Sequence, residues 1–151
     1  MKSTEADMMF PVLGFAPDGD ILGFPDLDTL TSCGPRTLRE NLQIGVELVD
    51  AAGRRWVVRS VVRLGRGEPL LKWIVSALLW ACQSRIEQEL EPLAPLSLDE
   101  IKERTCAAVE RDAWVYADDH PRKLKVLLAK IRAAKSAAAI HGMLGLDNFT
   151  S

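Results

Sequence analysis

An alternation of apolar and polar residues on both sides of a short turn constrains the fold of this chain most. The apolar positions are Ile44, Val46, Leu48, Trp56, Val58, Val62 and Leu64. A period of two is typical of β-strands with one buried face. If Asp50 lies opposite Arg54, the apolar sets of both strands share one side of the sheet, and Leu48 faces Trp56. The segment therefore predicts an antiparallel hairpin whose three-residue loop ends in Gly53.

A second hairpin is predicted earlier in the chain. Residues 9–16 and 20–24 are largely apolar and are joined by Pro17-Asp18-Gly19. Proline presets the backbone for the first turn position, and glycine accepts the left-handed conformation that closes a short loop. Residues 26–30 then leave room for one short helical turn, and residues 37–41 suit either a helix or a loop.

Helical patterns dominate the rest of the chain. Residues 68–91 are apolar on nearly every side as far as Cys82, which predicts a helix that is central to the core or pressed against another molecule. Ser97 and Glu100 form a capping box that opens a helix to about residue 117. Pro121 begins a third helix that ends near Gly142. The expected fold is α+β, with an N-terminal antiparallel sheet of about four strands in two hairpins, followed by about three helices.

Length and composition indicate one domain over residues 1–151. Apolar residues make up 48% of the chain and charged residues 26%, which is ordinary for a globular protein. Three cysteines without metal-like spacing suit reduced thiols. The acidic N-terminal residues do not resemble a signal peptide, and the longest apolar region, residues 70–82, is too short to span a bilayer. We therefore expect a cytoplasmic protein that does not enter a membrane.

No pattern of catalytic residues is found in the sequence, which contains no P-loop, GxGxxG, GxSxG or HExxH motif. Only His120 and His141 are available to activate a cysteine nucleophile. Cys82 and Cys106 lie in helical patterns, where cysteine is usually buried, whereas Cys33 lies in a Ser-Cys-Gly-Pro turn and is expected to be more exposed. We predict that the protein is not an enzyme and has no cofactor or metal site. A small enzyme built on Cys33 is the alternative.

Acidic residues are the candidates for binding a partner. We assign this role to Asp18, Asp20, Asp26, Asp28 and Glu47, with a solvated acidic rim as the simpler alternative. They do not form an EF-hand calcium loop, because its glycine and its terminal glutamate are missing. A second acidic stretch covers residues 87–119.

Two other surfaces are considered. Trp73 and Trp80 lie two turns apart on the expected helix 68–91, where they either pack in the core or form a homodimer or partner interface. The basic residues near the C-terminus are Arg122, Lys123, Lys125, Lys130, Arg132 and Lys135. A solvated helix face is the simpler interpretation, and a regulatory or nucleic-acid-binding module over residues 121–141 is the alternative. Nucleic acid is less expected, because no aromatic residue is interleaved with these bases and the net charge is −2.

Residues 9–64 contain two hairpins with a short acidic helical stretch between them. Within them Gly45, Glu47, Asp50, Gly53 and Arg54 match the pattern G-x-x-E-x-x-D-x-x-G-R, with a one-residue difference in the first spacing. In these features the N-terminal half resembles some immunity proteins of bacterial polymorphic and contact-dependent toxin systems, in which this pattern recurs. The resemblance implies a small cytosolic protein that binds one cognate toxin and blocks its active site or another essential surface.

Overall fold

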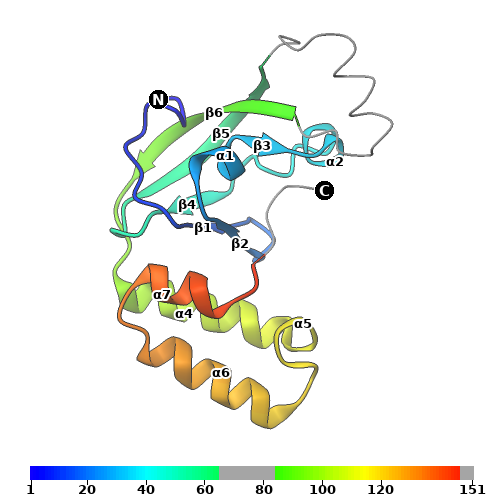
Figure 1. Ribbon diagram of the computed structural model, residues 1–151, viewed down its shortest axis with the longest axis vertical. Coiled ribbons are helices and arrows are strands. Elements are labelled where there is room, and N and C mark those ends of the chain that lie inside the picture. Colours follow the sequence, from blue (N-terminus) through cyan, green and yellow to red (C-terminus); the bar gives the residue numbers. More distant parts are fainter. Residues whose placement is uncertain (65–83, 147–151) are drawn as a thin grey trace.

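A six-stranded antiparallel sheet forms the centre of the computed structural model, which describes residues 1–64 and 84–146 (Figure 1). The strands are β1 Val12–Phe15, β2 Ile21–Phe24, β3 Ser32–Cys33, β4 Glu47–Val49, β5 Arg55–Arg63 and β6 Ser84–Leu93. Their order across the sheet is β2-β1-β4-β5-β6-β3. The α+β class expected from the sequence is confirmed, but the described residues form six strands where about four were expected.

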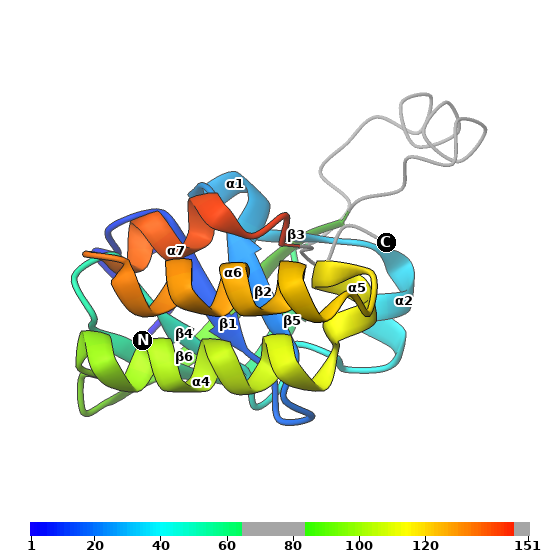
Figure 2. The same ribbon diagram turned by 90° about the horizontal axis from the view of Figure 1, so that it is seen from below.

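The described part of the chain contains six helices. They are α1 Leu27–Leu30, α2 Pro35–Arg39, α4 Leu98–Arg111, α5 Ala113–Ala117, α6 Pro121–Ala133 and α7 Ala137–Met143. Figures 1 and 2 show α4, α6 and α7 as a layer on one side of the sheet, and α1 and α2 beside the sheet itself. Four of the six helices follow the sheet in sequence, one more than expected.

The register predicted for the second hairpin is confirmed. Leu48 pairs with Trp56, and the loop between β4 and β5 ends in Gly53, whose φ is +83°. The turn is held by Asp50, whose carboxylate accepts hydrogen bonds from the backbone N–H groups of Ala52 and Arg54 at 3.0 and 2.9 Å. The first hairpin is also confirmed, since β1 and β2 pair antiparallel around the Pro-Asp-Gly turn.

The prediction that Val62 and Leu64 point to the apolar side of β5 is wrong. The pairing of β5 with β6 shifts by one residue between Val58 and Ser60. A bulge of this kind reverses which residues face the core beyond it. Val61 therefore packs on the core, and Val62 is 60% exposed.

The helix predicted over residues 68–91 is wrong for its last part, because residues from Ser84 onward belong to β6; residues 68–83 lie outside the described residues. Ile86 and Leu90 are buried on one face of this strand. Their spacing of four residues suits one face of a helix and one face of a strand equally well. Gln88 is also buried, so every second residue from Ile86 to Leu90 is buried. This period of two is that of a strand. Pro92, just beyond the predicted helix, pairs with Trp56 within the sheet.

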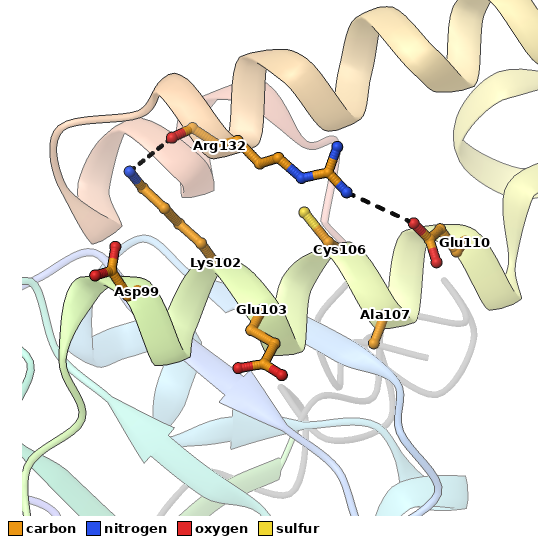
Figure 3. Close-up of a pocket in the computed structure, with 7 residues that line it drawn as sticks. All are labelled: Asp99, Lys102, Glu103, Cys106, Ala107, Glu110 and Arg132. Atoms are coloured by element: carbon orange, nitrogen blue, oxygen red, sulfur yellow. Dashed lines mark hydrogen bonds and ion pairs between the residues drawn. The ribbon is translucent and has the colours of Figure 1, made fainter.

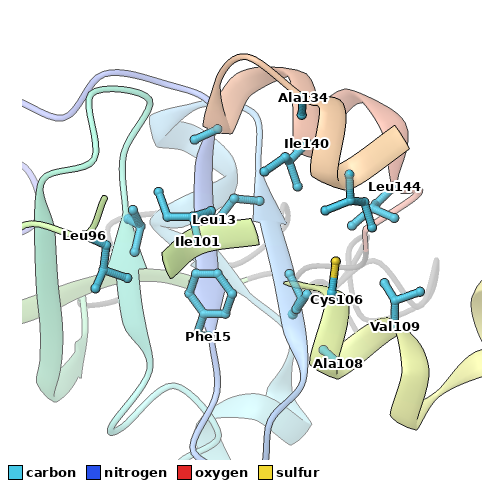
Figure 4. Packing of buried hydrophobic residues seen from close by; sticks show 14 of the residues in the cluster. Leu13, Phe15, Leu96, Ile101, Cys106, Ala108, Val109, Ala134, Ile140 and Leu144 are labelled. Atoms are coloured by element: carbon cyan, nitrogen blue, oxygen red, sulfur yellow. The ribbon is translucent and has the colours of Figure 1, made fainter. Parts of the chain in front are cut away.

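Two apolar cores lie on opposite faces of the sheet, because neighbouring residues of a strand point in opposite directions. Leu13 faces the helical layer (Figure 4), and Val12 faces the other core. The first core includes Leu13, Phe15, Ile21, Val49, Ile101, Val109, Ile131 and Ile140. The second includes Val12, Leu22, Phe24, Leu30, Leu48, Trp56, Val58 and Leu90.

The helical layer begins as predicted. Ser97 and Glu100 form the capping box of α4, with Ser97 Oγ accepting from the backbone N–H of Glu100 at 3.2 Å. This helix ends at Arg111, so the prediction of one helix to residue 117 is wrong; a second helix, α5, follows Asp112. Pro121 occupies the first turn of α6, as expected. This helix ends at Ala133, so the prediction of one helix from Pro121 to near Gly142 is wrong; α7 follows Ser136 as a separate helix.

Candidate functional site

Asp18 and Asp20, predicted to bind a partner, lie in the turn between β1 and β2 and contact Arg111 at the end of α4. The Arg111 guanidinium donates to the backbone carbonyl of Asp18 and forms an ion pair with the Asp20 carboxylate. Asp20 keeps 57% of its side chain exposed. The two residues therefore help to attach the first hairpin to the helical layer.

Asp26 and Asp28 lie at the start of α1 and have different roles. The Asp26 carboxylate caps the helix by accepting hydrogen bonds from the backbone N–H and the hydroxyl of Thr29, both at 2.7 Å. These hydrogen bonds lower the pKa of Asp26. Asp28 forms an ion pair of 3.1 Å with Arg85 of β6, yet 82% of its side chain remains exposed. Of the two, Asp28 is the more available to a partner.

Glu47 is the first residue of β4 and is paired with two arginines, Arg55 of β5 and Arg104 of α4. Its carboxylate is 3.0 Å from Arg55 Nη1 and 2.8 Å from Arg104 Nη1. Partial burial by itself would raise the pKa of Glu47, but the hydrogen bonds and charges of Arg104 and Arg55 outweigh it, and the pKa is lowered. The Arg104 guanidinium also lies over the ring of Phe15 at 5.8 Å. Glu47 thus links the sheet to α4 through its ion pair with Arg104.

The structure places the five predicted acids at three separate positions, namely the first turn, the start of α1 and the surface of β4 beneath α4. Within residues 1–64 and 84–146, no three histidine, cysteine or carboxylate side chains form a group that could hold a metal ion.

A row of three glutamates on β6 was not singled out from the sequence. We call Glu87, Glu89 and Glu91 the glutamate row. They alternate with the buried residues Ile86, Gln88 and Leu90, so they project from the opposite face of the strand. Glu89 and Glu91 each have 52% of their side chains exposed. The row was missed because these residues were assigned to a helix, in which they would point in different directions.

Each member of the glutamate row has a basic neighbour. Glu87 lies 3.2 Å from the Lys2 ammonium, Glu89 is paired with the N-terminal amino group of Met1, and Glu91 is paired with Arg59. The partners of Glu87 and Glu89 come from the first two residues of the chain. The hydrogen bond from Arg59 lowers the pKa of Glu91.

A groove of about 500 Å³ lies between α4 and α6 (Figure 3). Its lining residues are Asp99, Lys102, Glu103, Cys106, Ala107, Glu110 and Arg132. Lys102 Nζ donates to the backbone carbonyl of Arg132 at 2.8 Å, and the Arg132 guanidinium lies 4.0 Å from Glu110. Burial raises the pKa of the Cys106 thiol, and no histidine lines the groove. The groove therefore offers no activated nucleophile.

The expectation that Cys33 is exposed is wrong. Cys33 belongs to β3 and is 1% exposed, because β3 pairs with the start of β6. Burial raises the pKa of its thiol to about 11, so the reactive thiolate is scarce near neutral pH. These observations argue against the alternative of an enzyme built on this residue.

The basic residues of α6 are largely free of internal partners. Lys123 is paired with Asp118 at 3.0 Å, and Arg132 lies near Glu110. Arg122, Lys125 and Lys130 form no ion pair within the part of the chain that the structure describes. In this respect the bases of α6 differ from the acids predicted as the binding site, most of which are paired with arginines.

Comparison with known protein families, with curated proteins and with solved structures found no match to this chain. Trp73 and Trp80, the predicted interface residues, lie outside the described residues, as does Cys82. Among the helices that are described, none has the length and apolar character needed to span a membrane.

Proposed function

We propose that this chain is a non-catalytic protein-binding domain, and specifically an immunity protein that neutralises a cognate bacterial toxin by direct binding. The glutamate row is the observation that carries this proposal. It places three carboxylates on one face of a single strand, and two of them, Glu89 and Glu91, have about half of their side chains exposed. The resemblance that implies a toxin-binding protein covers residues 9–64, which precede this strand.

A basic toxin surface is the partner that the glutamate row fits. Alternate residues of a strand are about 7 Å apart on one face, so the carboxylates are evenly spaced. A basic partner would have to take the place of their present neighbours, which are Lys2, the N-terminal amino group and Arg59. The strand pairs with β5 over most of its length, which holds the carboxylates in place before a partner arrives. Evenly spaced carboxylates can pair with basic side chains across an interface and can occupy a channel that otherwise binds phosphates.

The absence of an activated nucleophile at the two described cysteines supports a binding role. Cys33 and Cys106 are both buried, and burial raises the pKa of each thiol. Of the histidines, His141 is partly buried, which lowers its pKa, and neither it nor His120 lines the groove beside Cys106.

The test uses the purified protein encoded by the neighbouring gene as the candidate toxin, titrated with this chain in a calorimeter. We expect a complex that the double substitution Glu89→Lys, Glu91→Lys weakens by at least about tenfold, or ~1.4 kcal/mol. The matched control is Glu103→Lys, an exposed acid on α4 that should change affinity by less than about twofold.

Two results would contradict the proposal in different ways. No complex with the neighbouring protein would remove the toxin-binding function. A complex that tolerates the substitutions in the glutamate row but is weakened by Asp28→Lys would move the binding site to the acids predicted from the sequence.

A further inference from the structure

Helices α5 and α6 carry large apolar side chains that remain in contact with water. Trp114 and Val115 of α5 are 67% and 55% exposed, and Val126 of α6 is 55% exposed. The two helices pack against each other, and Figure 2 shows α5 at one end of α6. Exposed apolar side chains surrounded by polar ones are typical of protein-interaction surfaces.

A groove of about 340 Å³ lies between these two helices, and we call it the α5–α6 groove. Its lining residues are Tyr116, Arg122, Lys123, Val126, Leu127 and Lys130. Half of them are apolar or aromatic and half are basic, and no acid is among them. The groove thus combines an apolar contact surface with positive charge.

The basic and apolar residues of the groove have a regular arrangement. Arg122, Val126 and Lys130 follow one another at intervals of four residues, so they form one ridge along α6. The rise of an α-helix places the two outer cations about 12 Å apart, with the valine between them. Neither Arg122 nor Lys130 has an ion-pair partner in the described ranges, whereas Lys123 is paired with Asp118.

We infer that the α5–α6 groove binds an acidic amphipathic segment of a protein partner. One aliphatic or aromatic side chain of the segment would rest on Val126 and Leu127, and two carboxylates would pair with Arg122 and Lys130. Carboxylates about 12 Å apart are found about four residues apart in an extended segment or about eight residues apart in a helix. Such a partner satisfies both the charge and the apolar surface of the groove.

A nucleic acid fits the α5–α6 groove less well. Binding of single strands relies on bases stacked on aromatic side chains, and the groove contains one aromatic ring, that of Tyr116. Val126 and Leu127 offer aliphatic surface, which a phosphate backbone does not use. Charge complementarity alone would allow nucleic acid, but the apolar half of the lining favours a peptide.

The inference concerns a different surface from the glutamate row and does not depend on toxin binding. In Figure 1, β6 lies in the sheet and α6 is the helix farthest from it. A substitution in one surface therefore tests that surface alone.

A phage-displayed library of random peptides of about 12 residues, long enough to reach both cations, provides the probe. The library is selected against the whole protein, and the affinity of enriched peptides is measured by fluorescence anisotropy. We expect enriched peptides to carry at least two acids around an apolar residue. Val126→Glu and Lys130→Glu should each weaken their binding by at least about tenfold, a loss typical of a central contact.

The matched control is Lys125→Glu, which changes the same charge on the same helix but lies outside the groove lining; it should change affinity by less than about twofold. All three positions are exposed, and circular dichroism verifies that each variant is folded. Failure to enrich any peptide, or enriched peptides without acids, would overturn the inference. The inference would also be overturned if a fluorescent oligothymidylate bound more tightly than the enriched peptides and lost this binding in Lys130→Glu. That result would assign the groove to nucleic acid.

Discussion

Removal of the Asp50 carboxylate is expected to destabilise the protein strongly. Asp50 is fully buried at the turn between β4 and β5. Its carboxylate accepts hydrogen bonds from the backbone N–H groups of Met9, Ala52 and Arg54 at 3.1, 3.0 and 2.9 Å. It also accepts one from Arg54 Nε at 2.9 Å. The residue therefore joins the hairpin to the segment that precedes β1.

The size of the effect follows from these donors. In Asp50→Ala, three backbone N–H groups lose their acceptor, and each loss costs about 1 kcal/mol where water replaces it poorly. The Arg54 side chain is 43% exposed, so its guanidinium regains water and the broken ion pair adds little. We expect a loss of about 3 kcal/mol, a large share of the roughly 5–15 kcal/mol that stabilises most domains.

Urea denaturation followed by circular dichroism measures this loss. With a denaturant dependence of about 2 kcal/mol per molar urea, the midpoint should fall by about 1.5 M. Asp50→Asn retains one acceptor oxygen and should lose less. The control is Glu110→Ala, which removes an exposed partner of Arg132 and should cost less than about 0.5 kcal/mol. A loss below about 1 kcal/mol for Asp50→Ala would refute the assignment of these hydrogen bonds as stabilising.

Three further predictions concern the strand β6, Cys33 and Glu47. Ile86→Asp should lower the free energy of unfolding, measured by urea denaturation, by at least about 3 kcal/mol, because Ile86 is buried. Val62→Asp should lower it by less than about 1 kcal/mol, because Val62 is exposed. Equal losses would argue against this orientation of the strands. In a background with Cys82→Ser and Cys106→Ser, Cys33 should react with a thiol reagent only after unfolding, because the folded thiol is buried and its pKa is about 11. Rapid reaction of the native protein at neutral pH would contradict this. Because its arginine neighbours lower the pKa of Glu47, its stabilising contribution is complete above the ordinary glutamate pKa of about 4.3 and is lost as the pH falls through the lowered pKa. The difference in urea midpoint between wild type and Glu47→Gln should therefore be present at neutral pH and vanish in acid; a constant difference would contradict it.

The two hairpins were predictable because their signals are local. Asp50, Gly53 and Arg54 are close in sequence and define the turn, and the residues that alternate on either side are within reach of one another. The capping box at Ser97 is local in the same way. Each of these features needs only the chemistry of a few neighbouring residues.

The strand β6 was not predictable by the same reasoning. Residues 84–91 contain three glutamates together with Arg85, Gln88 and Leu90, and residues of these types favour helices in isolation. The strand forms because Ile86 and Leu90 pack beside residues that are distant in sequence, and because Gln88 Nε2 donates to the carbonyl of Leu30 at 2.6 Å and to Gln43 Oε1 at 2.9 Å. Tertiary contacts of this kind override local preference. The burial of Cys33 has the same origin, because it depends on the pairing of β3 with β6.

For the candidate site, the sequence could indicate which acidic residues are candidates but not which of them face outward. The acids Asp20, Asp28 and Glu47 stand out in the sequence, but each lies against an arginine that is distant in sequence. Their ion pairs depend on the fold, so the sequence could not separate acids that link elements from acids that face outward. The glutamate row depends likewise on the period of β6.

The net charge of −2 conceals an uneven distribution of acids and bases over the fold. The acids of the glutamate row lie on a sheet strand, and the bases of α6 lie in the helical layer (Figure 1). The acids on β6 are each paired with a basic neighbour, whereas Arg122, Lys125 and Lys130 of α6 form no ion pair among the described residues. Salt should weaken binding at both surfaces, since both use exposed charges. Only the α5–α6 groove, whose lining also contains Val126 and Leu127, should retain part of its affinity at high salt, because apolar contact does not depend on screening.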